Sequence, residues 1–175
     1  MLAGVGVLLT GCAGEPAPAP TVTVTAEAAP ATPEPTPGAS AEPDGPLALG
    51  SAAEFDDFSM IVHAVNLDPV PAPAPQPERA EDKWASADVE YCSKIESSIT
   101  SYWWRMSAAD NRQYEPSDVG YSAFQEPAYA WGEVPVAADS CHRGWITFTV
   151  NREAVLETVR YANDKGHSAE WAIPQ

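Results

Sequence analysis

Basic residues are scarce in this chain, and none occurs before Arg79. Lysine and arginine together number nine, against 25 aspartate and glutamate residues, and the formal net charge at pH 7 is −16. A chain of this charge is repelled by the phosphates of nucleic acids and by anionic lipid head groups. We therefore expect no nucleic-acid partner, and the simplest role of the charge is solubility.

Long apolar runs are also missing, since a membrane-spanning helix needs about 20 apolar residues. The N-terminal run covers only residues 2–9 and is followed by Thr10, Gly11 and Cys12. Its length fits the hydrophobic region of a cleaved signal peptide. The sequence Leu9-Thr10-Gly11-Cys12 resembles the bacterial lipobox, which implies cleavage before Cys12 and acylation of that cysteine. The basic residues that usually precede such a run are absent, so either the true start lies upstream or the signal is unusual.

Aromatic residues are absent from residues 13–46, which contain nine prolines. A polar stretch without hydrophobic periodicity cannot bury enough surface to offset its ordering entropy. Proline-rich chains extend by about 3.1 Å per residue, so this segment reaches roughly 100 Å. We expect a signal peptide over residues 1–11, a lipidated cysteine and disordered tether over 12–47, and one domain over 48–175.

Only three cysteines are present, and Cys12 belongs to the export signal. Cys92 and Cys141 remain as an even pair in a domain that we expect to be exported, where a disulfide is the natural outcome. Closing a loop of about 50 residues stabilises a fold by about 4 kcal/mol in the chain-entropy treatment. A catalytic redox pair usually has Cys-x-x-Cys spacing, which this pair lacks.

Strand patterns dominate the rest of the chain. Residues 84–94 alternate with a period of two, which predicts a buried face with Ala85, Ala87, Val89 and Tyr91 and a solvated face with Ser86, Asp88, Glu90 and Cys92. Further strands are predicted at 58–65, 97–106, 113–114, 129–134, 144–150, 155–161 and 168–173. Five prolines between 69 and 77 predict a loop. About seven short strands with turns between them favour an antiparallel β-sandwich.

A family resemblance rests on three of these segments: Gly144-Trp-Ile-Thr-Phe-Thr-Val, Val159-Arg-Tyr-Ala and Glu170-Trp171. Together they resemble the C-terminal half of an uncharacterised immunoglobulin-like, telokin-like domain family of actinobacterial surface lipoproteins. The resemblance covers roughly residues 48–175. It implies an immunoglobulin-like sandwich at the cell surface and no catalytic residue.

Motifs of enzyme active sites are missing. The sequence contains no Gly-x-Ser-x-Gly and no Ser-x-x-Lys, so an activated serine has no local signature. His63, His142 and His167 are far apart, and Cys141-His142 is the only adjacent pair among the histidines and cysteines. We expect no catalytic residue, no metal and no cofactor. A Ser-His-Asp site assembled only in three dimensions stays open.

The run Tyr102-Trp103-Trp104 is the most distinctive feature of the domain sequence. In a strand, Trp103 and Trp104 point to opposite faces, so one belongs to the core and the other can offer a flat apolar surface. Trp131 can extend that surface. A sugar or a protein is the expected partner, and coverage of both rings by loops is the plainer alternative.

These features predict a non-enzymatic binding or adaptor module, lipid-anchored at the extracytoplasmic face of the bacterial membrane. An envelope protein is the leading partner. Recognition of a cell-wall or capsular glycan through exposed tryptophans is the first alternative, and a hydrolase with a site formed only in the fold is the second. The oligomeric state stays open.

Overall fold

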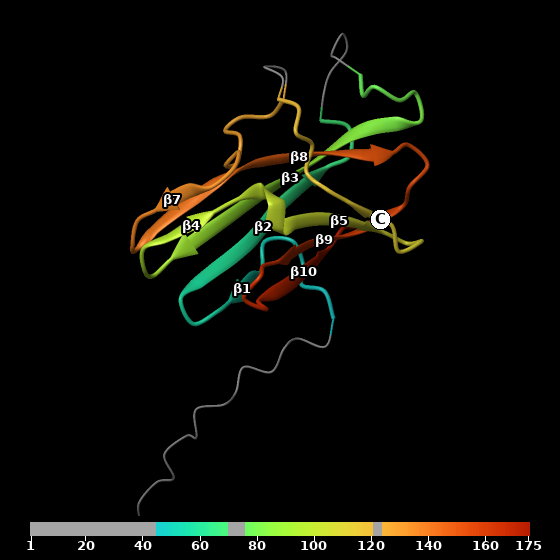
Figure 1. Ribbon diagram of the computed structural model, residues 1–175. Coiled ribbons are helices and arrows are strands. Elements are labelled where there is room, and N and C mark those ends of the chain that lie inside the picture. Colours follow the sequence, from blue (N-terminus) through green and yellow to red (C-terminus); the bar gives the residue numbers. More distant parts are fainter. Residues whose placement is uncertain (1–44, 70–75, 121–123) are drawn as a thin grey trace, which may run out of the picture. The chain divides into compact units, whose positions relative to one another are not determined.

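The computed structural model describes residues 45–69, 76–120 and 124–175 (Figure 1). Cys12, the expected signal peptide and most of the expected tether lie outside the described residues. So does most of the proline-rich loop between 69 and 77. No helix within the described residues has the length and apolar character needed to cross a bilayer.

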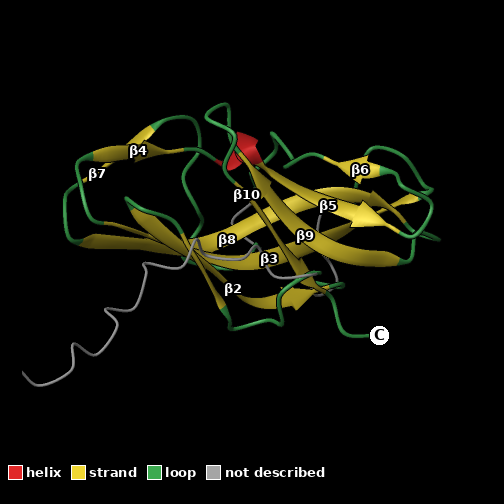
Figure 2. Cartoon of the chain, turned by 90° about the horizontal axis from the view of Figure 1, so that it is seen from below, coloured by secondary structure: helices red, strands yellow, loops and turns green. Residues whose placement is uncertain are grey.

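Two four-stranded antiparallel sheets form the domain and lie as two layers in Figure 2. The first sheet has the order β1 (Ala52–Glu54), β2 (Phe58–Asn66), β3 (Asp82–Ser93) and β8 (Ser140–Asn151). The second has the order β10 (Ser168–Ala172), β9 (Leu156–Ala162), β5 (Trp104–Ala108) and β6 (Gln113–Tyr114). A separate ribbon pairs β4 (Ser97–Ile99) with β7 (Val134–Val136). The predicted antiparallel β-sandwich is therefore confirmed.

The core lies between the two sheets and follows the alternation of the strands. On β3 the inward face is the one expected, and Ala85, Ala87, Val89 and Tyr91 are all buried. Trp171 on β10 is fully buried, and its neighbour on the same face, Ile173, is 6% exposed. The fully buried large side chains include Val62, Trp104, Phe148, Val159 and Trp171.

The outer face of β3 differs from the expectation of a solvated surface. Ser86 is 1% exposed and Asp88 is 6% exposed. The Ser86 hydroxyl donates a hydrogen bond to the side-chain carbonyl of Gln125, and the Asp88 carboxylate accepts from Nε and Nη2 of Arg143, the latter at 2.6 Å. Gln125, which lies in an irregular segment, contributes to this cover, and the strand periodicity of β3 does not reveal it.

The run 97–106 is not one strand. It is divided into β4, a short 3-10 helix η1 (Ser101–Trp103) and β5, and the side chain of Thr100 caps η1 by accepting from the backbone N–H of Tyr102. The strand predicted at 129–134 is also wrong. Residues 127 and 129 instead bond to Trp145 at the edge of β8, and β7 begins at Val134.

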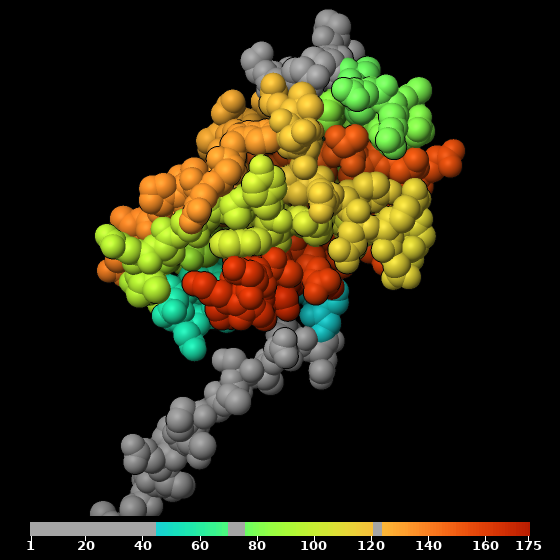
Figure 3. Space-filling model, viewed as in Figure 1, coloured from blue at the N-terminus to red at the C-terminus, as the bar shows by residue number. Residues whose placement is uncertain are grey.

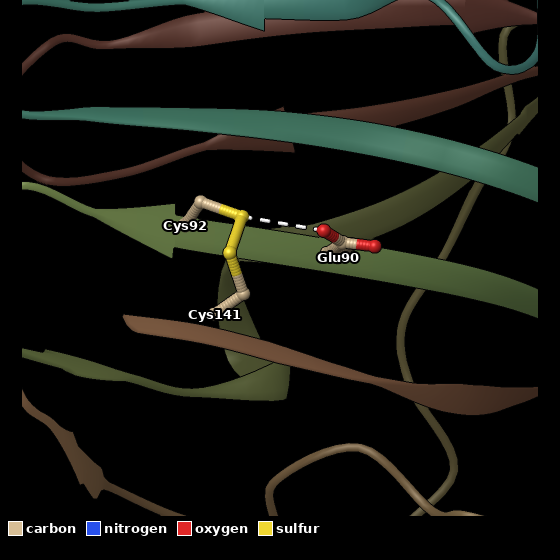
Figure 4. Close-up of side chains that lie close together, drawn as sticks. All are labelled: Glu90, Cys92 and Cys141. Atoms are coloured by element: carbon tan, nitrogen blue, oxygen red, sulfur yellow. Dashed lines mark hydrogen bonds between the residues drawn. A yellow bond between two sulfur atoms is a disulfide. The ribbon is translucent and has the colours of Figure 1, made fainter. Parts of the chain in front are cut away.

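The predicted disulfide is present and joins two neighbouring strands of the same sheet (Figure 4). Cys92 on β3 and Cys141 on β8 are direct partners in the strand register, and their Cα atoms are 4.0 Å apart. The bridge therefore reinforces an existing strand pair, whereas the disulfide of antibody domains joins two sheets.

The edges of both sheets are short or occupied. β1 has three residues and β6 has two. The outer edge of β8 accepts a hydrogen bond from Ser117 N to Thr147 O, and the edge of β10 exchanges two backbone hydrogen bonds with Leu47. Long edges with unpaired backbone groups are the usual sites for adding a foreign strand.

Candidate functional site

The three tryptophans expected to form a ligand surface occupy different environments. Trp104 is fully buried in the core, so it has no surface to offer a ligand. Trp103 is half-buried at the end of η1, and Trp131 is 47% exposed. Trp103 and Trp131 line two separate concave sites, which we call the end groove and the edge pocket.

The end groove is an open cavity of about 930 Å³ between the β4–β7 ribbon and the turn that joins β9 to β10. In Figure 2 the β4–β7 ribbon lies at one end of the domain, beside the two sheets. The aromatic residues of the groove are Phe58, Tyr91, Trp103 and Tyr161. Its charged residues are Asp57, Glu96, Glu133, Asp164 and Lys165.

Carboxylates dominate the charge of the end groove, with four of them against one ammonium group. All five charged residues are exposed. The carboxylate of Glu133 accepts a hydrogen bond of 2.6 Å from the Ser98 hydroxyl, which ties it to β4. A cleft lined by charge of one sign over aromatic walls concentrates ligands of the opposite sign. The end groove is therefore suited to a cation.

Hydrogen bonds hold the walls of the end groove in place. On one side, the Tyr91 hydroxyl donates to Ser97 Oγ at 3.2 Å, and Ser97 donates to Ser93 Oγ at 3.0 Å. On the other, the Asn163 amide donates to the Tyr161 hydroxyl oxygen at 3.1 Å. Burial raises the pKa of the Tyr161 hydroxyl above its usual range. A site held in this way is largely formed before its ligand arrives.

The edge pocket is a cavity of about 240 Å³ along the outer edge of β8. Its aromatic residues are Phe124, Tyr129, Trp131 and Trp145, and its polar side chains are Ser101, Ser117, Gln125, Glu126 and Thr147. Three backbone bonds fix the covering segment to β8: Ser117 N to Thr147 O, Trp145 N to Pro127 O, and Tyr129 N to Trp145 O. In Figure 3 the yellow residues up to 120 and the orange residues from 124 to 137 form the surface of this part of the domain.

A third group surrounds the disulfide on the outer face of the first sheet (Figure 4). An oxygen of Glu90 lies 3.2 Å from Cys92 Sγ, and ligand atoms of Glu90, Cys92 and Cys141 all lie within 4.8 Å of one another. A disulfide sulfur carries no hydrogen, so the contact with Glu90 is a close polar approach. Metal ions bind cysteine as the thiolate, which the bridged pair does not offer.

The histidines do not activate a nucleophile in the described part of the chain. His63 Nε2 lies 2.8 Å from Glu90 Oε2, and His167 Nδ1 lies 3.3 Å from the Asn163 amide. Nε2 of His142 is buried without a hydrogen-bond partner. No serine or cysteine among residues 45–69, 76–120 and 124–175 bonds to any of these rings.

Sequence reasoning missed most of both sites. The outward position of Trp145 could be predicted from the alternation of residues in β8, because Trp145, Thr147 and Thr149 share one face of that strand. Phe124 and Gln125 carry no such signal, since they lie in an irregular segment. The four carboxylates of the end groove come from four distant parts of the chain, and no local pattern gathers them.

Comparison with known proteins gives similarity of fold alone. No known protein family and no curated protein matches the sequence. The YcdA protein of Bacillus subtilis, described as a candidate lipoprotein, has a TM-score of 0.53 and 15% identity, over 70% of this chain and 38% of that one. MPT63, a secreted protein of Mycobacterium tuberculosis, has a TM-score of 0.51 and 17% identity, over 74% and 99%.

The YjhA protein of Bacillus subtilis has a TM-score of 0.53 and 7% identity, over 73% of this chain and 99% of that one. At identities this low, the similarity to these three structures extends to the fold alone. The fold of this chain is an antiparallel β-sandwich.

Proposed function

We propose that this chain is a non-enzymatic binding module on the extracytoplasmic face of a bacterial membrane, and that its end groove binds a basic segment of a partner protein. The observation that carries the proposal is the combination of four exposed carboxylates with the partly exposed ring of Trp103 in one cavity of about 930 Å³. Lysine and arginine side chains fit such a site, because a cation is attracted both by carboxylates and by the faces of aromatic rings.

The size of the end groove favours a polypeptide over a small ion. Pockets that bind drug-sized ligands measure roughly 300–1,000 Å³, and the end groove lies near the upper end of that range. A cavity of this size holds several side chains at once. The net charge of −16 adds attraction at longer range and speeds the encounter with a basic partner.

The edges of the sheets make strand addition an unsuitable mode of partner binding. Leu47 bonds to β10, and the segment around Ser117 bonds to β8. The remaining edge strands of the two four-stranded sheets, β1 and β6, have three and two residues, and β4 and β7 of the ribbon have three residues each. A partner that binds this domain therefore uses side chains in a groove.

The location is supported by three observations. The sequence around Cys12 resembles a lipobox, the domain carries a disulfide between Cys92 and Cys141, and solved structures of similar fold include a candidate lipoprotein and a secreted protein. Anchoring is tested by expressing the full chain and its Cys12→Ala variant in a bacterium and separating detergent and aqueous phases. The proposal requires the parent chain in the detergent phase and the variant in the aqueous phase.

Binding is tested by calorimetric titration of the full chain with a synthetic arginine- and lysine-rich peptide, and with a matched peptide that has glutamine in place of each basic residue. We expect the basic peptide alone to bind, with an affinity that falls as salt is added. The Glu96→Gln/Glu133→Gln variant keeps the shape and one acceptor oxygen of each side chain but removes both negative charges, and it should bind about tenfold more weakly.

The matched control is Glu153→Gln/Glu157→Gln, which removes two exposed carboxylates that do not line the end groove. It should bind the peptide as the parent chain does. Equal binding of both peptides, or equal weakening by both double variants, would show that general charge attraction explains the result and would reject the groove as the site.

A further inference from the structure

The edge pocket is independent of the end groove. No residue lines both cavities, and the two are separated by η1, whose first residue, Ser101, lines the edge pocket and whose last residue, Trp103, lines the end groove. The chemistry of the two linings also differs. The end groove carries five charged residues, whereas the edge pocket carries one, Glu126. A second class of ligand is therefore expected at the edge pocket.

Indole surface is the first component of the edge pocket. Trp131 is 47% exposed, which is unusual for the largest apolar side chain, and a Cβ built at Gly120 would lie 3.7 Å from its ring. The absence of a side chain at Gly120 leaves that part of the ring uncovered. Trp145 also lines the pocket and is partly exposed on the outward face of β8. Two indoles beside one cavity offer flat apolar surface to a ligand.

Hydrogen-bonding side chains are the second component. The Oε1 atom of Gln125 accepts from the Ser86 hydroxyl, which orients the amide, and Nε2 of Gln125 has no hydrogen-bond partner among the described residues. Oε2 of Glu126 accepts from the backbone N–H of Ala128 at 3.1 Å, which holds that carboxylate at the pocket. The hydroxyl of Ser117 adds a group that both donates and accepts.

Size and charge narrow the class of ligand. A cavity of about 240 Å³ is smaller than the roughly 300–1,000 Å³ of pockets for drug-sized molecules, so it holds one ring of a larger ligand. Among the described residues of the lining, the one charged side chain is acidic and none is basic, which disfavours phosphates, carboxylates and sulfates. The ligand must also present an apolar face to the indoles and several hydroxyl groups to the polar side chains.

We propose that the edge pocket binds one pyranose ring of a neutral polysaccharide. A pyranose has C–H groups on its faces, which stack on Trp131 and Trp145, and hydroxyl groups around its rim, which bond to Gln125, Glu126 and Ser117. The bond pattern suits both partners, because a hydroxyl donates to the Glu126 carboxylate and accepts from the Gln125 amide. A proline ring also stacks on indole but has no rim of hydroxyls, so it would form no hydrogen bonds with these three polar side chains.

The test is a titration of the full chain, labelled with ¹⁵N, with two neutral oligosaccharides: a hexamer of N-acetylglucosamine and a hexamer of glucose. The chain has six tryptophans, whose indole N–H signals are separated by NMR and assigned with single Trp→Phe variants. We expect one of the sugars to shift the signals of Trp131 and Trp145 and to leave that of the buried Trp104 unchanged. Trp131→Ala should weaken binding by about tenfold or more.

The matched control is Tyr102→Ala, which removes an aromatic side chain that is 61% exposed and lies outside the edge pocket. It should bind the sugar as the parent chain does, and thermal melting should show that both variants are folded. The proposal is rejected if neither sugar shifts Trp131 at millimolar concentration. It is also rejected if a proline-rich peptide shifts Trp131 and Trp145 and the sugars do not. Because ligand and variants differ from those used for the end groove, each proposal can fail alone.

Discussion

The indole nitrogen of Trp171 donates a hydrogen bond of 2.8 Å to the carbonyl oxygen of Ser51, across 120 residues of sequence. Trp171 belongs to β10 of the second sheet, and Ser51 precedes β1 of the first. Leu47, four residues earlier, bonds to β10 through its backbone, while Gly50 bonds to Val62 of β2. The segment 47–54 therefore fastens the two sheets together around one buried tryptophan.

Replacement of Trp171 by phenylalanine should destabilise the domain by about 2 kcal/mol or more. The variant leaves the partly buried carbonyl of Ser51 without its donor and opens a cavity where the larger ring was. The measurement is urea unfolding followed by circular dichroism. The exposed Trp131 provides the control, because Trp131→Phe should change the free energy of unfolding by less than about 0.5 kcal/mol. Equal stability of both variants would contradict the fastening role of Trp171.

Gly144→Ala should destabilise the domain by about 2 kcal/mol or more, since its new methyl group meets backbone that cannot move freely. A Cβ at this position would lie 2.6 Å from Tyr129 N and 2.7 Å from the carbonyl carbon of Ala128. Thermal unfolding is the measurement. At Gly120 the nearest atom to a new Cβ is 3.7 Å away, so Gly120→Ala should be tolerated. If Gly144→Ala lowered the melting temperature as little as Gly120→Ala, the backbone at Ala128 and Tyr129 would be shown to move easily.

Removal of the disulfide with Cys92→Ser/Cys141→Ser should lower the free energy of unfolding by up to about 4 kcal/mol while the fold is kept. The cysteines are 49 residues apart in sequence, so the bridge mainly restricts the unfolded chain. The β3–β8 pairing holds both positions in register without it. The comparison is urea unfolding of the oxidised parent and the double variant. A variant that is unfolded in water would show that the bridge is needed for the strand pair itself.

Alkaline pH should destabilise the domain through two buried tyrosines. Burial raises the pKa of Tyr129 and Tyr161 above its usual value of about 10. Because the folded-state pKa is the higher one, the stability contribution of each hydroxyl is complete below about pH 10 and declines as the pH rises further. The measurement is the free energy of unfolding against pH. Tyr129→Phe should show a weaker decline than the parent chain, and an unchanged decline would exclude Tyr129 as a cause.

The buried faces of the strands could be predicted because a period of two is imposed by the core. Ala85, Ala87 and Val89 are the inward residues of β3, as expected, and Trp171 is the inward residue of β10. The prediction of a solvated outer face on β3 failed because side chains from outside the sheet cover part of that face. Ser86 was expected to be solvated, but Gln125 from an irregular segment bonds to its hydroxyl, and such segments have no periodicity to read.

The candidate sites were harder to predict for a related reason. Trp103 and Trp104 were expected to lie on opposite faces of one strand, and one was expected to be core. Trp104 is core, but η1 ends at Trp103 and gives that residue a position that strand alternation does not describe. Glu96 and Glu133 meet in the end groove only because β4 pairs with β7, a contact between segments more than 30 residues apart.

The proposed lipid anchor would hold many copies of the domain close together on one membrane, and the short and occupied edges of the sheets would then limit their association. Crowding brings neighbouring domains into repeated contact, and exposed edges would let their sheets join into larger aggregates. Here β1 and β6 offer only a few backbone groups, β10 is occupied by Leu47, and β8 by the segment around Ser117. Each copy is therefore able to remain a separate particle at high local density, with its cavities open to solvent.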